Sequence, residues 1–162
     1  MNLSVRRQTA FAAAILGLIV LIPADASSQA AKPTAKDKCP VCGMFVAQYP
    51  AFLAEVVFED GFRAYFDGPK DMFRYYFEPE KYTPGKKTAG IAAVYVTDYY
   101  SLESIDGRQS FYISGSDVMG PMGNELVPVL LETQAKTFMA DHKGKTILRF
   151  NEVTLEIVNS LD

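Results

Sequence analysis

Two cysteines and a methionine lie within six residues of one another, at Cys39, Cys42 and Met44, and these are the only cysteines in the chain of 162 residues. Copper(I) prefers thiolate and thioether donors and accepts two or three ligands. Gly43 lets the backbone turn tightly between the donors. A Cys-x-x-Cys pair also forms disulfides and redox couples, depending on the compartment. A copper(I) site is the leading hypothesis, and a simple disulfide remains the alternative.

A second group of sulfur atoms, from Met119 and Met122, lies in a stretch rich in glycine and proline. Residues 120–123 have the sequence Gly-Pro-Met-Gly, which is typical of a loop and not of a helix. Met72 and Met139 recur at helical spacing with other apolar residues and are expected in the core. We therefore expect Met122 to be a further metal ligand, from a loop that closes over the cysteine turn, with Met119 as the weaker candidate.

Thiol-disulfide exchange and zinc binding are two other chemistries of which a cysteine pair is capable. In a thioredoxin-type oxidoreductase the first cysteine lies at a helix N-terminus, which lowers its pKa. Here residues 43–46 have no helical cap or period and no strand precedes the pair, so we expect a protein that is not an enzyme. An exported thiol-disulfide oxidoreductase using Cys39 and Cys42 is the alternative. A closed zinc site needs four donors, which two cysteines and one histidine do not supply without carboxylates.

The other polar candidates have structural interpretations. His142 lies near the end of an expected helix, where a solvated or dipole-compensating role is expected. Asp67 and Asp71 are four residues apart at the start of another expected helix, and capping and solvation explain them. The sequence contains no phosphate-binding loop, dinucleotide fingerprint or nucleophile elbow.

The elements that would position these residues form two similar series. In the first, apolar patterning and turn signals predict a strand over 52–58, a return strand over 62–66, a helix that begins at Pro69 and a strand over 91–97. The second series has strands over 110–114, 126–131 and 146–150, a helix over 133–142 before the last strand and a short closing helix over 154–161. The predicted fold class is α+β, with two packed ββαβ units forming one compact body.

The first thirty residues resemble an export signal. Arg6 and Arg7 precede an apolar run over 10–22, and small residues follow at 24–30. The apolar run is shorter than the ~20 residues of a spanning helix, so a cleaved signal peptide is expected. No cysteine lies near the small residues, so the protein is expected not to be a lipoprotein.

The expected organisation is a signal peptide over 1–30, a flexible tether over 31–38, a first ββαβ unit over 39–103 and a second over 104–162. Removing the signal peptide changes the formal net charge from −3 to −4, which argues against a nucleic-acid partner. Two cysteines make no disulfide framework, so folding depends on hydrophobic burial.

Several short motifs occur in a fixed order between residues 39 and 161. They are Cys42-Gly43-Met44, Phe66-Asp67-Gly68, Val96-Thr97-Asp98-Tyr99, Gly120-Pro121-Met122-Gly123, Gly144-Lys145 and Leu148-Arg149-Phe150. In this combination the chain resembles the NosL family of nitrous oxide reductase accessory proteins.

The resemblance implies a periplasmic copper(I) chaperone built from paired ββαβ units. Its partners would be apo nitrous oxide reductase or another copper acceptor, and an ABC-type membrane complex. The resemblance leaves open whether two copies of the chain form a homodimer that shares copper. Cys42, Met44 and Met122 correspond to the sulfur positions of the family, and Cys39 adds a thiol that the Cys-Gly-Met pattern does not require. Such proteins are commonly lipoproteins, and this sequence departs from that pattern.

Overall fold

The computed structural model describes residues 30–162, and almost all of the expected signal peptide lies outside these residues. The described chain begins with a turn-rich segment that holds both cysteines, followed by the short 3-10 helix η1 (Val46–Gln48). An antiparallel hairpin of β1 (Ala54–Phe58) and β2 (Arg63–Phe66) comes next. Gly61, with φ +84°, occupies the left-handed region in the hairpin turn, where glycine is favoured.

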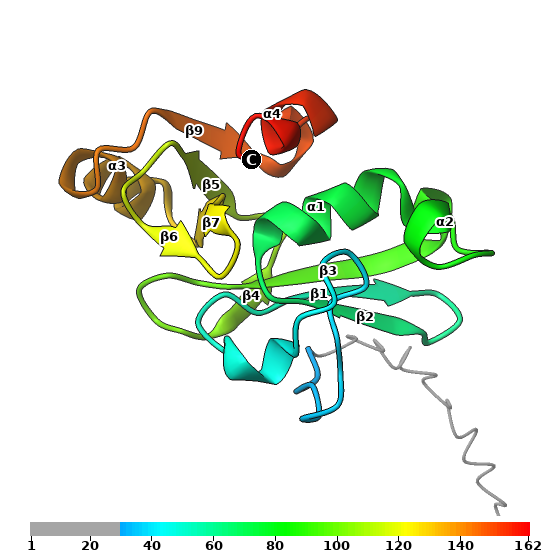
Figure 1. Cartoon of the computed structure of the whole chain (residues 1–162). Coiled ribbons are helices and arrows are strands. Elements are labelled where there is room, and N and C mark those ends of the chain that lie inside the picture. Colours follow the sequence, from blue (N-terminus) through cyan, green and yellow to red (C-terminus); the bar gives the residue numbers. More distant parts are fainter. Residues whose placement is uncertain (1–29) are drawn as a thin grey trace, which may run out of the picture.

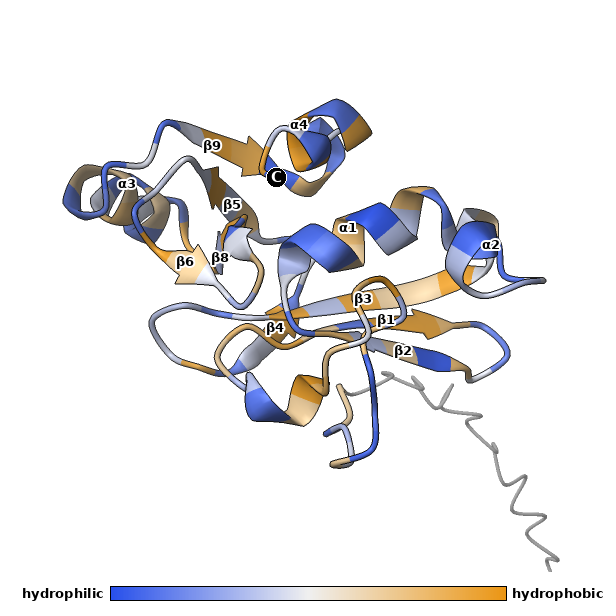
Figure 2. Cartoon of the chain, in the orientation of Figure 1, coloured by the Kyte–Doolittle hydropathy of each residue, from blue (hydrophilic) through white to orange (hydrophobic). Residues whose placement is uncertain are grey.

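The first sheet has the strand order β2-β1-β3-β4, and every pair in it is antiparallel. Its other strands are β3 (Ile91–Thr97) and β4 (Ser104–Asp106). Helix α1 (Pro69–Phe77) lies across one face of this sheet, and α2 (Pro79–Tyr82) and η2 (Thr88–Gly90) lead back to β3 (Figure 1). All five residues of β1 are buried, and β1 and β3 are largely apolar in Figure 2.

The second sheet has the order β8-β5-β9 and is also antiparallel. It consists of β5 (Phe111–Ser114), β8 (Val127–Val129) and β9 (Thr146–Arg149), and α3 (Glu132–Asp141) packs against it. Between β5 and β8 the chain forms a small hairpin of β6 (Met119–Gly120) and β7 (Gly123–Asn124), which we call the Met122 hairpin (residues 119–124). After β9, η3 (Phe150–Glu152) leads to α4 (Leu155–Asn159), which packs on α1.

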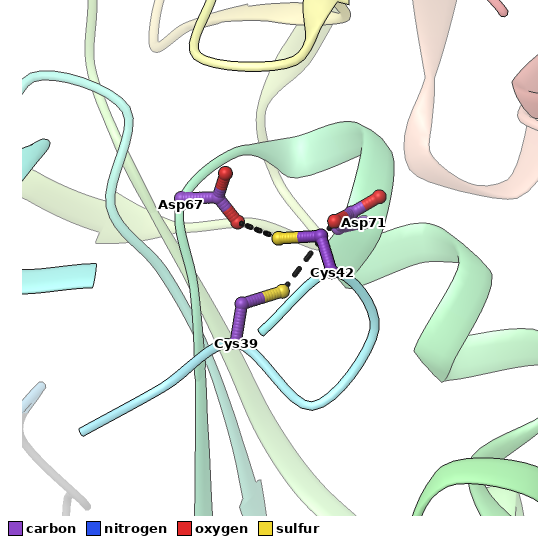
Figure 3. A group of neighbouring side chains, drawn as sticks. All are labelled: Cys39, Cys42, Asp67 and Asp71. Atoms are coloured by element: carbon purple, nitrogen blue, oxygen red, sulfur yellow. Dashed lines mark hydrogen bonds between the residues drawn. The ribbon is translucent and has the colours of Figure 1, made fainter. Parts of the chain in front are cut away.

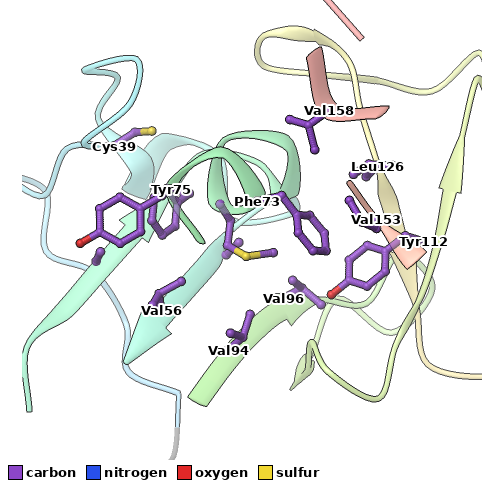
Figure 4. Close-up of a cluster of buried hydrophobic side chains, with 14 of the residues drawn as sticks. Cys39, Val56, Phe73, Tyr75, Val94, Val96, Tyr112, Leu126, Val153 and Val158 are labelled. Atoms are coloured by element: carbon purple, nitrogen blue, oxygen red, sulfur yellow. The ribbon is translucent and has the colours of Figure 1, made fainter. Parts of the chain in front are cut away.

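The two units share one hydrophobic core. Phe73 of α1 contacts Tyr112 of β5 and Phe150 of η3, with ring centroids 5.0 Å apart in each pair. Figure 4 shows Phe73 and Tyr112 between residues of the first sheet and residues of the C-terminal part, such as Val153 and Val158. A smaller core cluster lies between α3 and the second sheet. Residues of both units therefore pack against α1 and fix its position. The candidate site lies at the N-terminus of this helix.

The α+β fold class is confirmed, and strands and helices follow the predicted ββαβ order twice. Besides the short 3-10 helices η1, η2 and η3, three features of the structure were not expected: β4, α2 and the Met122 hairpin, the last within a stretch predicted to be a loop. They are short, with two to four residues each, and such lengths give too little periodicity for a pattern to show.

Candidate metal site

The two cysteines lie on a tight turn that precedes η1. The Cys39 N–H donates to the Met44 carbonyl over 2.9 Å, and the Gly43 N–H donates to the Cys39 carbonyl over 2.9 Å. Gly43 has φ +81°, a conformation that a residue with a Cβ rarely adopts. The turn therefore brings Cys39 and Cys42 to the same side, with the half-buried Met44 two residues after Cys42.

Two carboxylates from the junction of β2 and α1 face these cysteines. The Cys42 thiol donates to Asp67 Oδ1 over 3.1 Å, and the Cys39 thiol donates to Asp71 Oδ2 over 3.4 Å (Figure 3). One sulfur or oxygen atom from each of the four residues lies within 4.8 Å of the other three. We call these residues, Cys39, Cys42, Asp67 and Asp71, the Cys/Asp cluster.

Burial differs among the members of the Cys/Asp cluster. Cys39, Asp67 and Asp71 are buried, with exposed fractions of 1%, 1% and 3%, whereas Cys42 is half-buried. The second oxygen of Asp67, Oδ2, is buried and has no hydrogen-bond partner within residues 30–162. A buried carboxylate oxygen without a partner is costly, and such an atom at a group of metal-binding residues is what a cation would satisfy.

Burial also controls the protonation of the thiols. It raises the pKa of the Cys42 thiol to about 12, against the opposing hydrogen bond from the Met44 N–H. Burial raises the pKa of Cys39 still further, although the N–H groups of Cys42 and Val41 donate to its sulfur. Without a metal, both cysteines are therefore protonated at neutral pH, which fits their role as donors to Asp67 and Asp71.

The capping interpretation of Asp67 and Asp71 was wrong. Gly68 is the N-cap residue of α1, with no side-chain capping bond, and Asp67 precedes it. Both carboxylates are buried and not solvated. They lie 25 and 32 residues from the cysteines that they contact, so nothing in the local sequence indicates the pairing. The donors that the sequence lacked for a four-ligand site are thus supplied by carboxylates.

The Met122 hairpin is attached to the same end of α1. The buried Lys70 ammonium donates to the Met122 carbonyl over 2.8 Å, and Lys70 directly precedes Asp71. The side chains of Met122 and Met119 are exposed by 47% and 56%, so neither fills a core gap. The structure therefore joins Cys39 and Cys42 in one cluster, keeps Met44 beside Cys42, and anchors the backbone of Met122 to the helix turn that carries Asp71.

Glu125 also joins the chain after the Met122 hairpin to α1. The sequence alone did not indicate a role for this residue. Its Oε1 accepts hydrogen bonds from the N–H of Lys70, over 2.6 Å, and from the N–H of Leu126, over 2.9 Å. The side chain is 3% exposed, and burial raises its pKa to about 8 against these two bonds and the Lys70 charge. Glu125 thus satisfies an N-terminal amide of α1 that no side chain of the helix itself serves.

Gly68 packs against Glu125 so closely that a Cβ there would overlap Glu125 Oε2. We expect Gly68→Ala to lower the free energy of unfolding by about 1–3 kcal/mol, because Glu125 is held by the Lys70 amide and moves only at the cost of that bond. Gly90→Ala is the matched control, since its Cβ would meet only Phe58 at 3.7 Å. Urea denaturation of both variants measures the difference, and equal midpoints would contradict the packing described here.

His142 lies apart from the Cys/Asp cluster. It is the C-cap residue of α3, and its ring contacts Asp117 Oδ1 at 3.2 Å and the Tyr99 hydroxyl at 3.3 Å. The Cys/Asp cluster is thus built without the single histidine of the chain.

Comparison with known proteins gives a consistent result. The family model described as NosL matches residues 30–158. The "Copper-binding lipoprotein NosL" of Stutzerimonas stutzeri is 27% identical over an alignment of 125 residues, and the match covers 72% of this chain. The chain spans 62% of the length of that relative.

The crystal structure of the copper chaperone NosL from Shewanella denitrificans superposes with a TM-score of 0.67 at 23% identity and shows the same fold. The superposition covers 79% of this chain and 97% of that one. Neither relative is named as an enzyme, in agreement with the expectation from the sequence.

The localisation expected from the sequence needs correction. The relative from Stutzerimonas stutzeri is named a lipoprotein, which contradicts the expectation that the protein is not one. That expectation rested on the absence of cysteine from a few residues near position 30, a local feature that lies almost entirely outside the described part of the chain. Within residues 30–162, no helix combines the length and the apolar character needed to cross a bilayer.

Proposed function

The chain belongs to the NosL family, and from this premise we propose that it carries copper(I) and passes it to an acceptor copper protein. Cys42 is the proposed thiolate ligand, with the thioethers of Met44 and Met122 completing a site of low coordination number. The observation that carries the proposal is the position of Cys42: it is half-buried, unlike Cys39, and Met44 follows it on the same turn. A metal bound there stays within reach of a partner protein.

The raised thiol pKa values argue against the oxidoreductase alternative. Disulfide exchange requires a thiolate nucleophile, and oxidoreductases lower the pKa of the attacking cysteine. Here burial raises the pKa of Cys42 to about 12, and Cys39 is raised further. Copper(I) removes this obstacle for its own binding, because coordination to a metal deprotonates a thiol directly.

Release to a partner would proceed by exchange of ligands. Neutral thioethers bind copper(I) more weakly than a thiolate, so incoming sulfur atoms would replace Met122 or Met44 before Cys42 lets go. The exposed side chain of Met122 on a small hairpin supports this order, because it can leave without disturbing the core. The family resemblance makes apo nitrous oxide reductase the first acceptor to test, together with an ABC-type membrane complex. A homodimer with shared copper is distinguished by sedimentation with and without the metal.

Anaerobic titration of the reduced protein with copper(I), against a chromophoric chelator, tests the proposal. We expect about one copper(I) per chain. Met122→Ala should still take up the ion but lose it to excess chelator about tenfold faster or more, since one weak ligand is missing. Met119→Ala is the matched control: it alters another exposed methionine of the same hairpin, and its loss rate should stay close to that of the unaltered protein.

Two outcomes would count against these assignments. Absence of tight copper(I) binding in the unaltered, reduced protein would remove the proposed function itself. Equal rates of copper loss for Met122→Ala and the unaltered protein would keep the function but remove Met122 from the ligand set.

A further inference from the structure

The Met122 hairpin has no apolar side chain of its own to anchor it. Its strands β6 and β7 have two residues each, and a two-stranded hairpin by itself is at best marginally stable in water. The side chains of Met119 and Met122 are exposed and contribute nothing to the hydrophobic core. The position of Met122 is therefore set by polar contacts with the rest of the chain.

Lys70, in the first turn of α1, makes a charge-assisted contact of this kind. Its ammonium group donates to the Met122 carbonyl over 2.8 Å, although the two residues are 52 positions apart, and the hairpin lies beside the N-terminal end of α1 (Figure 1). Lys70 is 2% exposed, and within residues 30–162 its ion-pair partner is the exposed Asp162, at 3.7 Å. A hydrogen bond from a charged donor is about twice as strong as one between neutral groups. The bond from Lys70 is therefore well suited to fix the backbone of Met122.

Glu125 fixes the distance between the helix and the hairpin. Its Oε1 accepts hydrogen bonds from the N–H groups of Lys70 and Leu126, so it joins the first turn of α1 to the chain that follows the hairpin. Its Oε2 lies against Gly68 of the helix end and Gly120 of the hairpin, so closely that a Cβ at either glycine would overlap it. The hairpin can therefore move along α1 only if Glu125 moves with it.

The stability of the fold does not by itself explain a lysine at position 70. Burying a charged group costs free energy, and replacing buried charges by apolar residues of similar volume is often neutral or stabilising. An apolar residue would fill the space but would have no donor for the Met122 carbonyl. What Lys70 provides, and an apolar residue does not, is a fixed position for Met122.

We propose that Lys70 and Glu125 are positioning residues that hold Met122 where its thioether reaches copper(I) on Cys42, and that they thereby set how fast the ion is released. This inference rests on the proposed function, with Met122 as a ligand. Neither residue touches the ion. A weak ligand that is held in place rebinds at a high effective concentration, so the ion stays bound although the thioether itself exchanges readily. Without Lys70 the ligand is present but no longer held.

The test is a double-mutant cycle on the rate of copper(I) loss to excess chelator. It compares Lys70→Leu, Met122→Ala and the variant with both changes. We expect Lys70→Leu to speed the loss about three- to tenfold, and the double variant to lose copper(I) no faster than Met122→Ala alone, because Lys70 acts through Met122. Lys81→Leu is the matched control: it removes an exposed lysine that pairs with Glu78, and its rate should equal that of the unaltered protein.

The position of the hairpin can also be measured without copper. Nuclear magnetic relaxation of ¹⁵N in the amides of residues 119–124 reports their motion on the picosecond to nanosecond timescale. In the copper-free protein we expect these amides to be as ordered as those of α1, and clearly less ordered in Lys70→Leu. If Lys70→Leu fails to fold in circular dichroism, Lys70→Gln takes its place, since its side chain is one bond too short for the Met122 carbonyl.

The proposal is overturned if the hairpin amides are equally ordered in the folded Lys70 variant and in the unaltered protein. It is also overturned if the two effects on copper(I) loss multiply in the double variant, because Lys70 would then act on something other than Met122. An unaltered protein that binds no copper(I) would refute the proposed function, and with it any effect of Lys70 on release. The order parameters would still show whether Lys70 anchors the hairpin, so the two failures are distinguished by different measurements.

Discussion

Replacement of Cys42 by serine should abolish copper(I) binding under competition, with a loss of affinity well beyond the 100-fold typical of an outer-shell change. Serine keeps the size of the side chain but replaces a soft sulfur by a hard hydroxyl oxygen that does not ionise near neutral pH. Because Cys42 is half-buried and Met44 follows it on the turn, no other thiolate is placed to take over with the same thioether partners.

Cys39→Ser is the matched control for this substitution. Cys39 lies three residues away in the same turn, but it is 1% exposed and its thiol donates to Asp71. We expect this variant to bind copper(I) about 10- to 100-fold more weakly, as for a group that supports a ligand without being one. Chelator competition on both variants, after a check of folding by circular dichroism, makes the comparison. A larger loss for Cys39→Ser than for Cys42→Ser would reverse the assignment.

Local patterns in the sequence predicted most of the helices and strands. The prediction of a strand over 91–97 coincides with β3, and proline after Gly68 marks the start of α1, since proline is favoured at the first helical position. The hairpin turn at Asp60 and Gly61 also follows from its residue types, because glycine there adopts a positive φ. Each of these signals acts over a few residues, so it is visible without knowledge of the fold.

The chemical environment of the site could not be predicted from local sequence patterns, because it depends on the fold. Lys70 and Glu125 are 55 residues apart and read as ordinary surface charges, yet both are buried and they fix the Met122 hairpin to α1. Asp67 likewise reads as a helix cap, because its contact with Cys42 depends on how the cysteine turn packs against α1. Pairing between distant segments is decided by the packing of the whole core, and neither periodicity nor composition encodes it locally.

A strong dependence of copper(I) affinity on pH is the second large effect that we expect. In the metal-free protein, burial raises the pKa of Cys42 to about 12, so its thiol is protonated throughout the range from pH 6 to 9. Copper(I) must displace this proton to bind the thiolate. The apparent affinity should therefore fall about tenfold for each unit by which the pH is lowered, which is about 1.4 kcal/mol per unit.

The number of protons released tests whether Cys42 is the one thiolate ligand of copper(I). Copper(I) on Cys42 alone should release one proton per ion, whereas copper(I) on both cysteines would release two and show an affinity that changes about 100-fold per pH unit. Cys39→Ser should leave the slope for copper(I) unchanged, because the Cys39 thiol keeps its proton when copper binds. Proton release in weakly buffered solution with a pH indicator, together with chelator competition at each pH, gives both quantities. An affinity for copper(I) that does not vary between pH 6 and 9 would mean that Cys42 is already a thiolate in the free protein, against the effect of its burial.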